Sequence, residues 1–104
     1  MQVVLTDPAR DALKAIYDYY VQEGYDTYAD DIRKTVISKA RSLPEAPYKG
    51  QEEPLLTPLK QGHRYVIAKK HYKVIYLIEA DIIYVTDVFD TRQDPVKMLK
   101  RHRK

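Results

Sequence analysis

The chain has 104 residues, of which 44% are hydrophobic and 32% charged, as is ordinary for one small domain with a modest core. It contains no cysteine, which excludes disulfides and thiolate metal sites. No stretch approaches the roughly 18 apolar residues of a membrane span, and the N-terminus lacks the basic start and apolar core of a signal peptide. We therefore expect a single domain over residues 1–104, without a membrane segment and located in the cytoplasm.

Positive charge gathers at the C-terminal end. The net charge is +3 and the pI about 9.0, an excess too small to indicate a polyanionic partner by itself. No acidic residue follows Asp94, and the basic residues of this tail are Lys97, Lys100, Arg101, Arg103 and Lys104. Two interpretations are open, a solvated end of the chain or a contact with nucleic acid.

The first elements in chain order are a short strand and a helix. Residues 3–5 form an apolar run that is typical of an edge or a central strand. Asp7 offers a helix N-cap, Pro8 suits the first helical position, and Gly24 is well placed to end the helix in a left-handed conformation. Apolar residues at helical spacing predict one buried stripe, made of Ala9, Ala12, Leu13, Ile16, Tyr17 and Tyr20.

A second helix is expected to begin with Asp26 or Thr27 as its N-cap and to stop at Pro44. Its buried face consists of Tyr28, Ile32, Val36, Ala40 and Leu43. Two neighbouring amphipathic helices with a short connection indicate an antiparallel helical hairpin. Residues 44–62, rich in proline, are the least regular part, and they either serve function or contain a short element around residues 55–59.

The rest of the chain has a strand pattern. Residues 64–68, 72–78 and 82–89 are rich in β-branched and aromatic side chains and are separated by short turns, which predicts an antiparallel meander. Asp94 as cap and Pro95 at the first position then open a short C-terminal helix. The predicted fold is therefore α+β, in the order β-α-α-β-β-β, with the meander packed against the helical hairpin and a short helix at the end.

Four segments carry a family resemblance. They are Ala12-Leu13-x-x-Ile16-Tyr17-Asp18-Tyr19-Tyr20, Gly62-x-Arg64-Tyr65, Tyr72-x-Val74-Ile75-Tyr76 and Val88-Phe89-Asp90-Thr91-Arg92-Gln93-Asp94-Pro95. Together with the element order they resemble the RelE/ParE superfamily of bacterial toxins. The resemblance covers almost the full chain, and residues 88–95 are its most specific part, whereas residues 44–62 are the least typical.

The resemblance implies the toxin of a type II toxin–antitoxin system of the plasmid-stabilisation type. Such a toxin inhibits growth and is held inactive by a cognate antitoxin, in a hetero-oligomer in which an antitoxin segment folds as it binds. The RelE branch cuts mRNA in the ribosomal A site. The ParE branch inhibits DNA gyrase and is not known as a nuclease. The expected target is therefore gyrase or the ribosome with its mRNA, and no cofactor is implied.

Three basic residues match catalytic positions of the RelE-like reaction. Cleavage of RNA by its 2′-hydroxyl needs a proton acceptor, stabilisation of the phosphorane charge and a proton donor. The resemblance places Arg64, Lys73 and Arg92 at basic positions of that pattern, and three converging cations could hold a phosphate. The RNA-binding candidates are Lys69, Lys70, Lys97, Lys100 and Arg101. The alternative is that Arg64 and Arg92 brace the fold through ion pairs or contact the antitoxin.

The expected proton-transfer residue is missing. No Tyr or His follows Arg92 until His102 in the basic tail. His71 is interpreted as a solvated turn residue, and the sequence specifies no partner for His63. Three scattered histidines offer no metal-ligand spacing, and the serines lack the glycine context of a nucleophile.

These observations favour a ParE-like toxin that binds a host protein such as gyrase and cuts no RNA. The alternatives are a RelE-like endoribonuclease that uses the three cations and a decayed member that only binds an antitoxin. Ten tyrosines invite an interpretation as base-stacking residues, but strand and helix spacing favours packing for most of them. Those expected to be exposed are Tyr19, Tyr25 and Tyr48.

Overall fold

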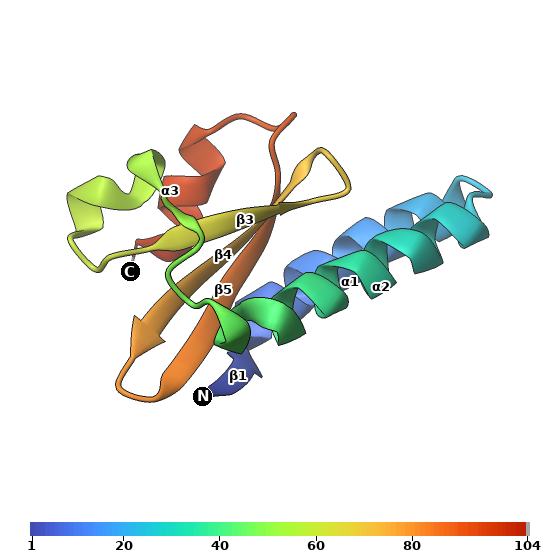
Figure 1. The fold of residues 1–104 in the computed structure, drawn as a ribbon. Coiled ribbons are helices and arrows are strands. Elements are labelled where there is room, and N and C mark those ends of the chain that lie inside the picture. The colour runs from blue at the N-terminus through green and yellow to red at the C-terminus, as the bar shows by residue number, and fades with distance from the viewer. Residues whose placement is uncertain (104) are drawn as a thin grey trace.

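A five-stranded sheet and a helical hairpin make up most of the protein (Figure 1). The computed structural model describes residues 1–103, and Lys104, the last residue of the predicted basic tail, lies outside that range. In chain order the elements are β1 (Gln2–Leu5), α1 (Asp7–Gln22), α2 (Asp26–Ser42), η1 (Leu43–Glu45), β2 (Gln51–Glu52), η2 (Pro54–Leu59), β3 (Arg64–Ala68), β4 (Tyr72–Glu79), β5 (Ile82–Asp90) and α3 (Val96–His102), where η denotes a 3₁₀ helix. The predicted α+β fold is confirmed, and β2 with the two 3₁₀ helices is added to it.

The strand order in the sheet is β1-β5-β4-β3-β2. Strands β3, β4 and β5 form the predicted antiparallel meander. β1 pairs in parallel with β5, with Gln2 opposite Ile82, so the first strand is an edge strand. β2 pairs with β3 at the other edge. Its two exposed polar residues, Gln51 and Glu52, carry no apolar alternation by which the sequence could have predicted a strand.

The start of α1 corrects a predicted cap. Thr6, rather than Asp7, caps the helix: its hydroxyl accepts a hydrogen bond from the N–H of Ala9 at 3.4 Å and donates to the carbonyl of Val85 at 2.8 Å. Both Thr and Asp are favoured N-caps, and the hydrogen bond of Thr6 to β5 decides between them. Gly24 has a φ of 85°, the left-handed conformation that was predicted for the residue ending this helix.

The other two helices also begin one residue away from their predicted caps. α2 starts at Asp26 itself, and its cap position is taken by Tyr25, which makes no side-chain capping bond. In α3 the cap position is Pro95, although the carboxylate of Asp94 still accepts the N–H of Val96 at 3.0 Å. Helix existence was predicted well, while the exact first residue was not.

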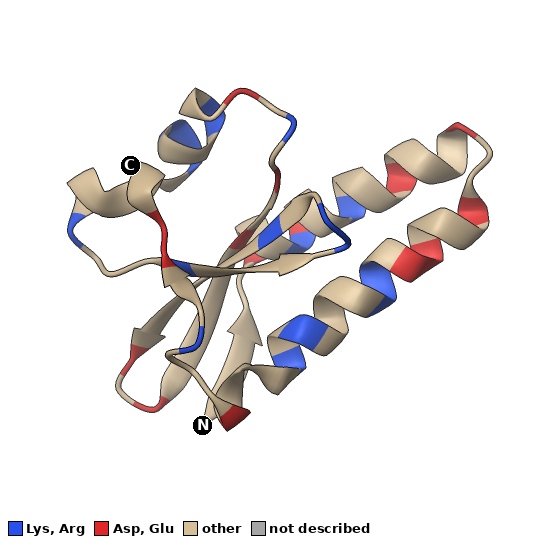
Figure 2. Ribbon diagram, turned by 45° about the horizontal axis from the view of Figure 1, so that its top comes forward, with Lys and Arg blue, Asp and Glu red and all other residues tan. Residues whose placement is uncertain are grey.

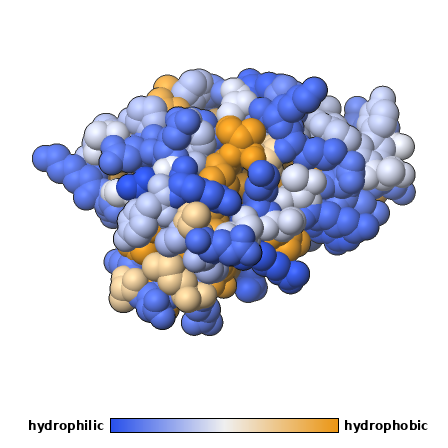
Figure 3. Space-filling model, in the orientation of Figure 1, coloured by the Kyte–Doolittle hydropathy of each residue, from blue (hydrophilic) through white to orange (hydrophobic). Residues whose placement is uncertain are grey.

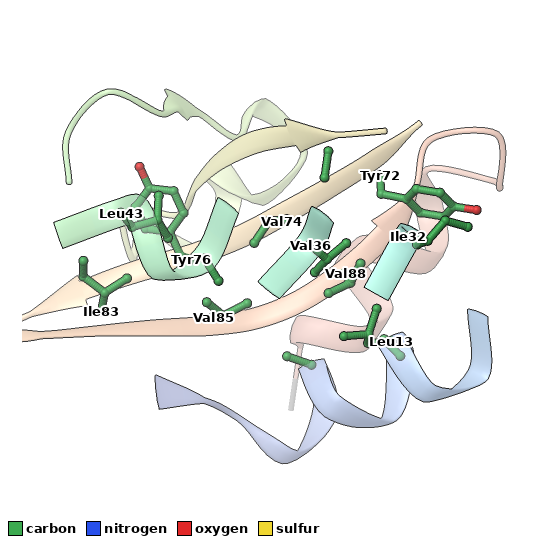
Figure 4. Packing of buried hydrophobic residues seen from close by; sticks show 14 residues of the cluster. Leu13, Ile32, Val36, Leu43, Tyr72, Val74, Tyr76, Ile83, Val85 and Val88 are labelled. Atoms are coloured by element: carbon green, nitrogen blue, oxygen red, sulfur yellow. The ribbon is translucent and has the colours of Figure 1, made fainter. Parts of the chain in front are cut away.

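The sheet is covered on both faces. The larger core lies between the sheet and the helical hairpin, where Leu13, Ile32 and Val36 of the helices meet Val85 and Val88 of β5 (Figure 4). A smaller core on the opposite face holds Leu56, Ile75, Phe89 and Met98 beneath η2 and α3. In Figure 1 the hairpin and α3 accordingly lie on opposite sides of the strands. The predicted packing of meander against hairpin is confirmed.

The segment between α2 and β3 is fastened by a buried tyrosine. The hydroxyl of Tyr76 donates to the carbonyl of Pro47 at 2.8 Å and accepts the N–H of Gly50 at 3.2 Å. A Cβ at Gly50 would lie 2.8 Å from the carbonyl oxygen of Tyr65, which leaves room for glycine alone. The element expected around residues 55–59 is η2.

The outer surface is mainly polar. Hydrophilic side chains cover most of the face seen in Figure 3, with apolar atoms gathered near its centre. Tyr19, Tyr25 and Tyr48 are exposed as predicted, and Tyr72 and Tyr76 are fully buried. None of the helices within residues 1–103 has the length and apolar character needed to cross a bilayer.

Candidate functional site

Arg92 lies where α1, β4 and the end of β5 meet. Its guanidinium contacts the carboxylate of Asp90 at 2.9 and 3.0 Å and donates to the hydroxyls of Tyr20 and Tyr72, each at 3.2 Å. Tyr20 comes from α1 and Tyr72 from β4, so the three elements share one polar junction. Sequence analysis identified Arg92 but none of these contacts, because Tyr20 lies 72 positions away.

The junction is fixed in one charge state near neutrality. The hydrogen bonds that Arg92 donates to Asp90 raise the pKa of Arg92 above its ordinary value, and the bond to Tyr20 adds to this shift. Burial alone would raise the pKa of Asp90, but the hydrogen bonds from Arg92 outweigh it and hold that pKa below its usual range. Burial raises the pKa of Tyr72, whereas the hydrogen bond with Tyr72 lowers the pKa of Tyr20. Arg92 and Asp90 therefore stay charged at neutral pH.

A groove of about 430 Å³ opens beside this junction, and we call it the α1 groove. Its α1 side consists of the small and apolar residues Ala12, Ala15 and Ile16, together with Tyr19. The rest of its lining consists of Tyr20, also on α1, and of Tyr72, Val88, Asp90, Arg92, Gln93 and Arg101. The groove thus combines an apolar floor with two arginines, each of which is paired with a carboxylate of the protein.

Lys73 is occupied by a buried ion pair. Its Nζ lies 2.6 Å from Oε1 of Glu53, whose side chain is fully buried, and 4.2 Å from the centre of the Tyr65 ring. The second carboxylate oxygen of Glu53 accepts the N–H of Leu55 at 2.9 Å, which caps η2. Lys73 therefore neutralises a carboxylate that holds η2 in place. Nothing in the sequence distinguishes Glu53 from the adjacent Glu52 as the buried residue, so this ion pair was not predicted.

Arg64 lies on the opposite face of the sheet from Lys73. Across the β3–β4 ladder Arg64 is opposite Tyr76, whereas Lys73 is opposite Ile67. Arg64 and Ile67 are separated by an odd number of positions, so their side chains leave opposite faces of β3. The guanidinium of Arg64 donates to the carbonyl of Gly50 at 2.8 Å, on the side of the larger core.

The three cations predicted to converge are therefore not brought together. Arg92 contacts Tyr72 at one end of β4, and Arg64 is paired with Tyr76, four residues further along that strand. Four residues of a strand span about 13 Å. Lys73 lies on the other face. The predicted convergence of these three side chains on one phosphate is wrong for this arrangement.

The predicted RNA-binding residues fall into two separate groups. Lys69 and Lys70 form the β3–β4 turn with φ values of 51° and 68°, and Nζ of Lys69 pairs with Asp31 of α2 at 2.8 Å. Lys97 and Lys100 are exposed on α3, which packs on the opposite face of the sheet from the helical hairpin. Figure 2 shows basic segments on both the short C-terminal helix and the hairpin. Arg101, also on α3, pairs with the buried carboxylate of Asp87. Their contact with RNA stays a prediction.

Two histidines far apart in sequence form a pair. The rings of His63 and His102 meet edge to face with centres 5.0 Å apart. His102 is the last residue of α3; its Nδ1 lies 2.9 Å from the carbonyl of Met98 and its Nε2 2.9 Å from the hydroxyl of Thr86. Through these contacts His102 anchors the end of α3. No sequence signal joins positions 63 and 102, because α3 and η2 bring them together only in the folded chain.

Among residues 1–103, no three side chains of His, Cys, Asp or Glu are grouped so as to hold a metal ion.

Comparison with known proteins identifies the family. The family described as the ParE toxin of the type II toxin–antitoxin system, parDE, matches residues 3–95. A solved structure described as the chromosomal ParDE TA system from P. aeruginosa has a similar fold, with a TM-score of 0.71 and 20% sequence identity over 86% of this chain and 95% of that chain. No curated protein sequence matches. The match spans β1 to the end of the Val88–Pro95 motif, and it confirms the superfamily resemblance: the chain belongs to the ParE toxin family of type II toxin–antitoxin systems.

Proposed function

We propose that the protein arrests growth by binding a host protein such as DNA gyrase, without cutting RNA, and that a cognate antitoxin neutralises it. We expect this activity in the cytoplasm. The observation that carries it is the dispersal of Arg64, Lys73 and Arg92, each of which is engaged by a partner inside the protein. Family membership supports the same conclusion.

The dispersal matters because phosphoryl chemistry depends on preorganised charge. Stabilising a phosphorane requires donors aimed at one point in space. Lys73 cannot turn toward a substrate without leaving the buried carboxylate of Glu53 unpaired, a loss of about 3–5 kcal/mol. Arg64 lies across the sheet from it. A RelE-like reaction would thus need a rearrangement of the sheet, whereas binding a protein partner would need none.

The α1 groove is the surface that we propose for the antitoxin. Ala12, Ala15 and Ile16 give it an apolar floor, and Arg92 and Arg101 give it positive charge. An antitoxin segment that folds on binding would place apolar side chains on this floor and acidic ones beside the arginines. The same docking would cover the Arg92 junction.

The test of the target is to express the gene in the absence of the antitoxin gene and then to make two measurements. We expect growth arrest, intact mRNA by primer extension, and loss of DNA supercoiling by purified gyrase when the purified protein is added. Discrete codon-linked cuts in mRNA would instead identify a ribosome-dependent nuclease. Absence of growth arrest would contradict both toxin mechanisms and leave a protein that only binds its antitoxin.

The test of the groove is a charge reversal at Arg92. Arg92→Glu should weaken antitoxin binding by about tenfold or more, because it places like charges together where the groove now attracts acidic residues. Lys70→Glu is the matched control, since Lys70 is an exposed cation on the β3–β4 turn, outside the groove. The melting temperatures of both variants are measured as a control, to show that neither substitution disrupts the fold. Equal affinity of the two variants for the antitoxin would contradict this docking site.

A further inference from the structure

A second pocket, of about 550 Å³, lies between the start of α1, the η2–β3 connection and the end of α3. We call it the α3 pocket. Its polar lining consists of Gln61, His63, Thr86, Arg101, His102 and Arg103. It shares Arg101 with the α1 groove, but its other lining residues differ.

The lining of the α3 pocket is rich in hydrogen-bond donors and positive charge. Two arginines, two histidines, a threonine and a glutamine face it, and among the described residues that line it none is acidic. Thr6, the N-cap of the 16-residue helix α1, and Pro8 also line the pocket, and Leu59 and Leu77 form its apolar part. The N-terminus of a helix adds partial positive charge, which favours an anion nearby.

His63 supplies an independent sign of a missing partner. The residue is only 5% exposed, yet its Nδ1 has no hydrogen-bond partner among residues 1–103. Buried polar atoms nearly always have a partner, and one without it loses about 1–3 kcal/mol. An oxygen-rich ligand in the pocket would offer the imidazole such a partner.

The frame of the pocket is held in place by contacts within the protein. Arg101 pairs with the carboxylate of Asp87, which is 1% exposed. His102 uses one ring nitrogen on the carbonyl of Met98 and has the other beside the hydroxyl of Thr86. Both ring nitrogens of His102 are thus engaged within the protein, and its ring is held in one orientation.

We propose that the α3 pocket binds a phosphate group, held by Arg103, Arg101 and His63 at the N-terminal end of α1. A tetrahedral anion accepts hydrogen bonds from several directions, as this set of donors requires. The pocket of about 550 Å³ has room for a larger group that carries the phosphate, such as a nucleotide or part of a nucleic-acid strand. The exposed Lys97 and Lys100 on α3 extend the positive charge away from the pocket. This binding goes beyond the proposed inhibition of a host protein and does not depend on it.

The test uses the histidines as reporters in NMR spectra of the whole protein. The chain has three histidines, so the imidazole signals can be assigned and followed separately. On titration with inorganic phosphate we expect the signals of His63 and His102 to move along a saturable curve. The signals of His71, in the β3–β4 turn, should not move. Absence of a saturable shift, or equal shifts of all three histidines, would overturn the proposal.

Two variants separate a built site from general attraction of anions. Arg103→Gln removes a charge from an exposed residue beyond the last helical turn, so the fold should be unchanged. It should weaken phosphate binding by about tenfold, the effect of one charged hydrogen bond. Lys70→Gln removes the same charge elsewhere on the surface and should have no effect. Equal weakening by both variants would indicate an adventitious ion only and would contradict the proposal.

The source of the phosphate follows from two further titrations, with a mononucleoside 5′-phosphate and with a short single-stranded oligonucleotide. Equal or tighter binding of the mononucleotide would identify a nucleotide site. Much tighter binding of the oligonucleotide, with a steep dependence on salt, would identify a strand backbone, because each neutralised phosphate releases counterions. Failure of both probes to compete with inorganic phosphate would contradict the assignment of the site to nucleotides or nucleic acid.

Discussion

Glu53 keeps a carboxylate inside the protein, and Lys73 neutralises it at 2.6 Å. Substituting Lys73→Met would leave that charge buried without its cation. We expect the free energy of unfolding to fall by about 3 kcal/mol, the lower part of the range for a broken buried pair. Urea denaturation at pH 7 measures this loss.

Two variants serve as controls for the Lys73 prediction. Lys97→Met removes an exposed lysine of α3 and should change the free energy of unfolding by less than about 0.5 kcal/mol. The double variant Lys73→Met with Glu53→Gln should recover much of the loss, because no buried charge remains. If Lys73→Met were as mild as the control, Lys73 would be free for another role, including the one that the RelE-like hypothesis gives it.

His63 makes the stability of the protein depend on pH. Burial lowers the pKa of His63 from 6.5 to about 4, and the neighbouring His102 adds to this effect. The unfolded chain therefore binds the proton more tightly than the native protein. The contribution of neutral His63 is complete above about pH 6.5 and is lost as the pH falls toward 4, by about 2–3 kcal/mol in total.

The prediction from His63 is a difference in slope between variants. Between pH 6.5 and 4 the free energy of unfolding should fall less steeply in His63→Gln than in the unmodified protein. His71→Gln should keep the original slope. Thermal or urea unfolding at a series of pH values gives both slopes, and parallel curves for all three proteins would contradict the assignment.

Among the elements, the loop between α2 and β3 depends on one hydroxyl. Tyr76→Phe removes both its donation to Pro47 and its acceptance from Gly50. We expect a loss of about 1–3 kcal/mol, since the buried N–H of Gly50 is left without a partner. Hydrogen exchange should speed up at Gly50 and nearby loop amides. Tyr84→Phe, on the half-buried face of β5, is the matched control and should change neither quantity by a comparable amount.

The elements were largely predictable because helical and alternating apolar patterns reflect which side of each element is buried. The apolar pattern could not predict features that depend on contacts between residues far apart in the sequence. Thr6 and Asp7 both suit a cap, and only the carbonyl of Val85 selects the first. The parallel pairing of residues 2–5 with residues 82–85 likewise depends on contacts across the whole chain.

The candidate site was predictable only in part, and strand register explains why. The motif around Arg92 correctly marked a residue at a junction of three elements. The predicted convergence of the three cations conflicts with the strand register. The turn over residues 69–71 sets Lys73 opposite Ile67, so Lys73 lies on the other face of the sheet from Arg64. No pattern could indicate the meeting of His63 with His102, because a tertiary contact between η2 and α3 creates it.

The whole molecule contains two apolar cores of unequal size on opposite faces of one sheet. Met98→Ala should cost about 2–5 kcal/mol locally, because Met98 is fully buried in the smaller core. We expect amides of α3 and η2 to lose protection from hydrogen exchange while those of α1, α2 and β5 keep theirs. Mass spectrometry of exchanged peptides distinguishes the two regions.

Val36→Ala is the matched variant for the larger core, where it should lower protection throughout the molecule. If Met98→Ala also lowered protection uniformly, the two cores would be one cooperative unit.

The parallel pairing of β1 with β5 has a consequence during synthesis. Gln2 finds its partner only when Ile82 has been added, and translation at about 5–20 residues per second takes several seconds to cover that distance. Until then the nascent chain has a helical hairpin, but β1 has no strand to pair with. A chain that is still being translated therefore lacks the complete sheet throughout that interval.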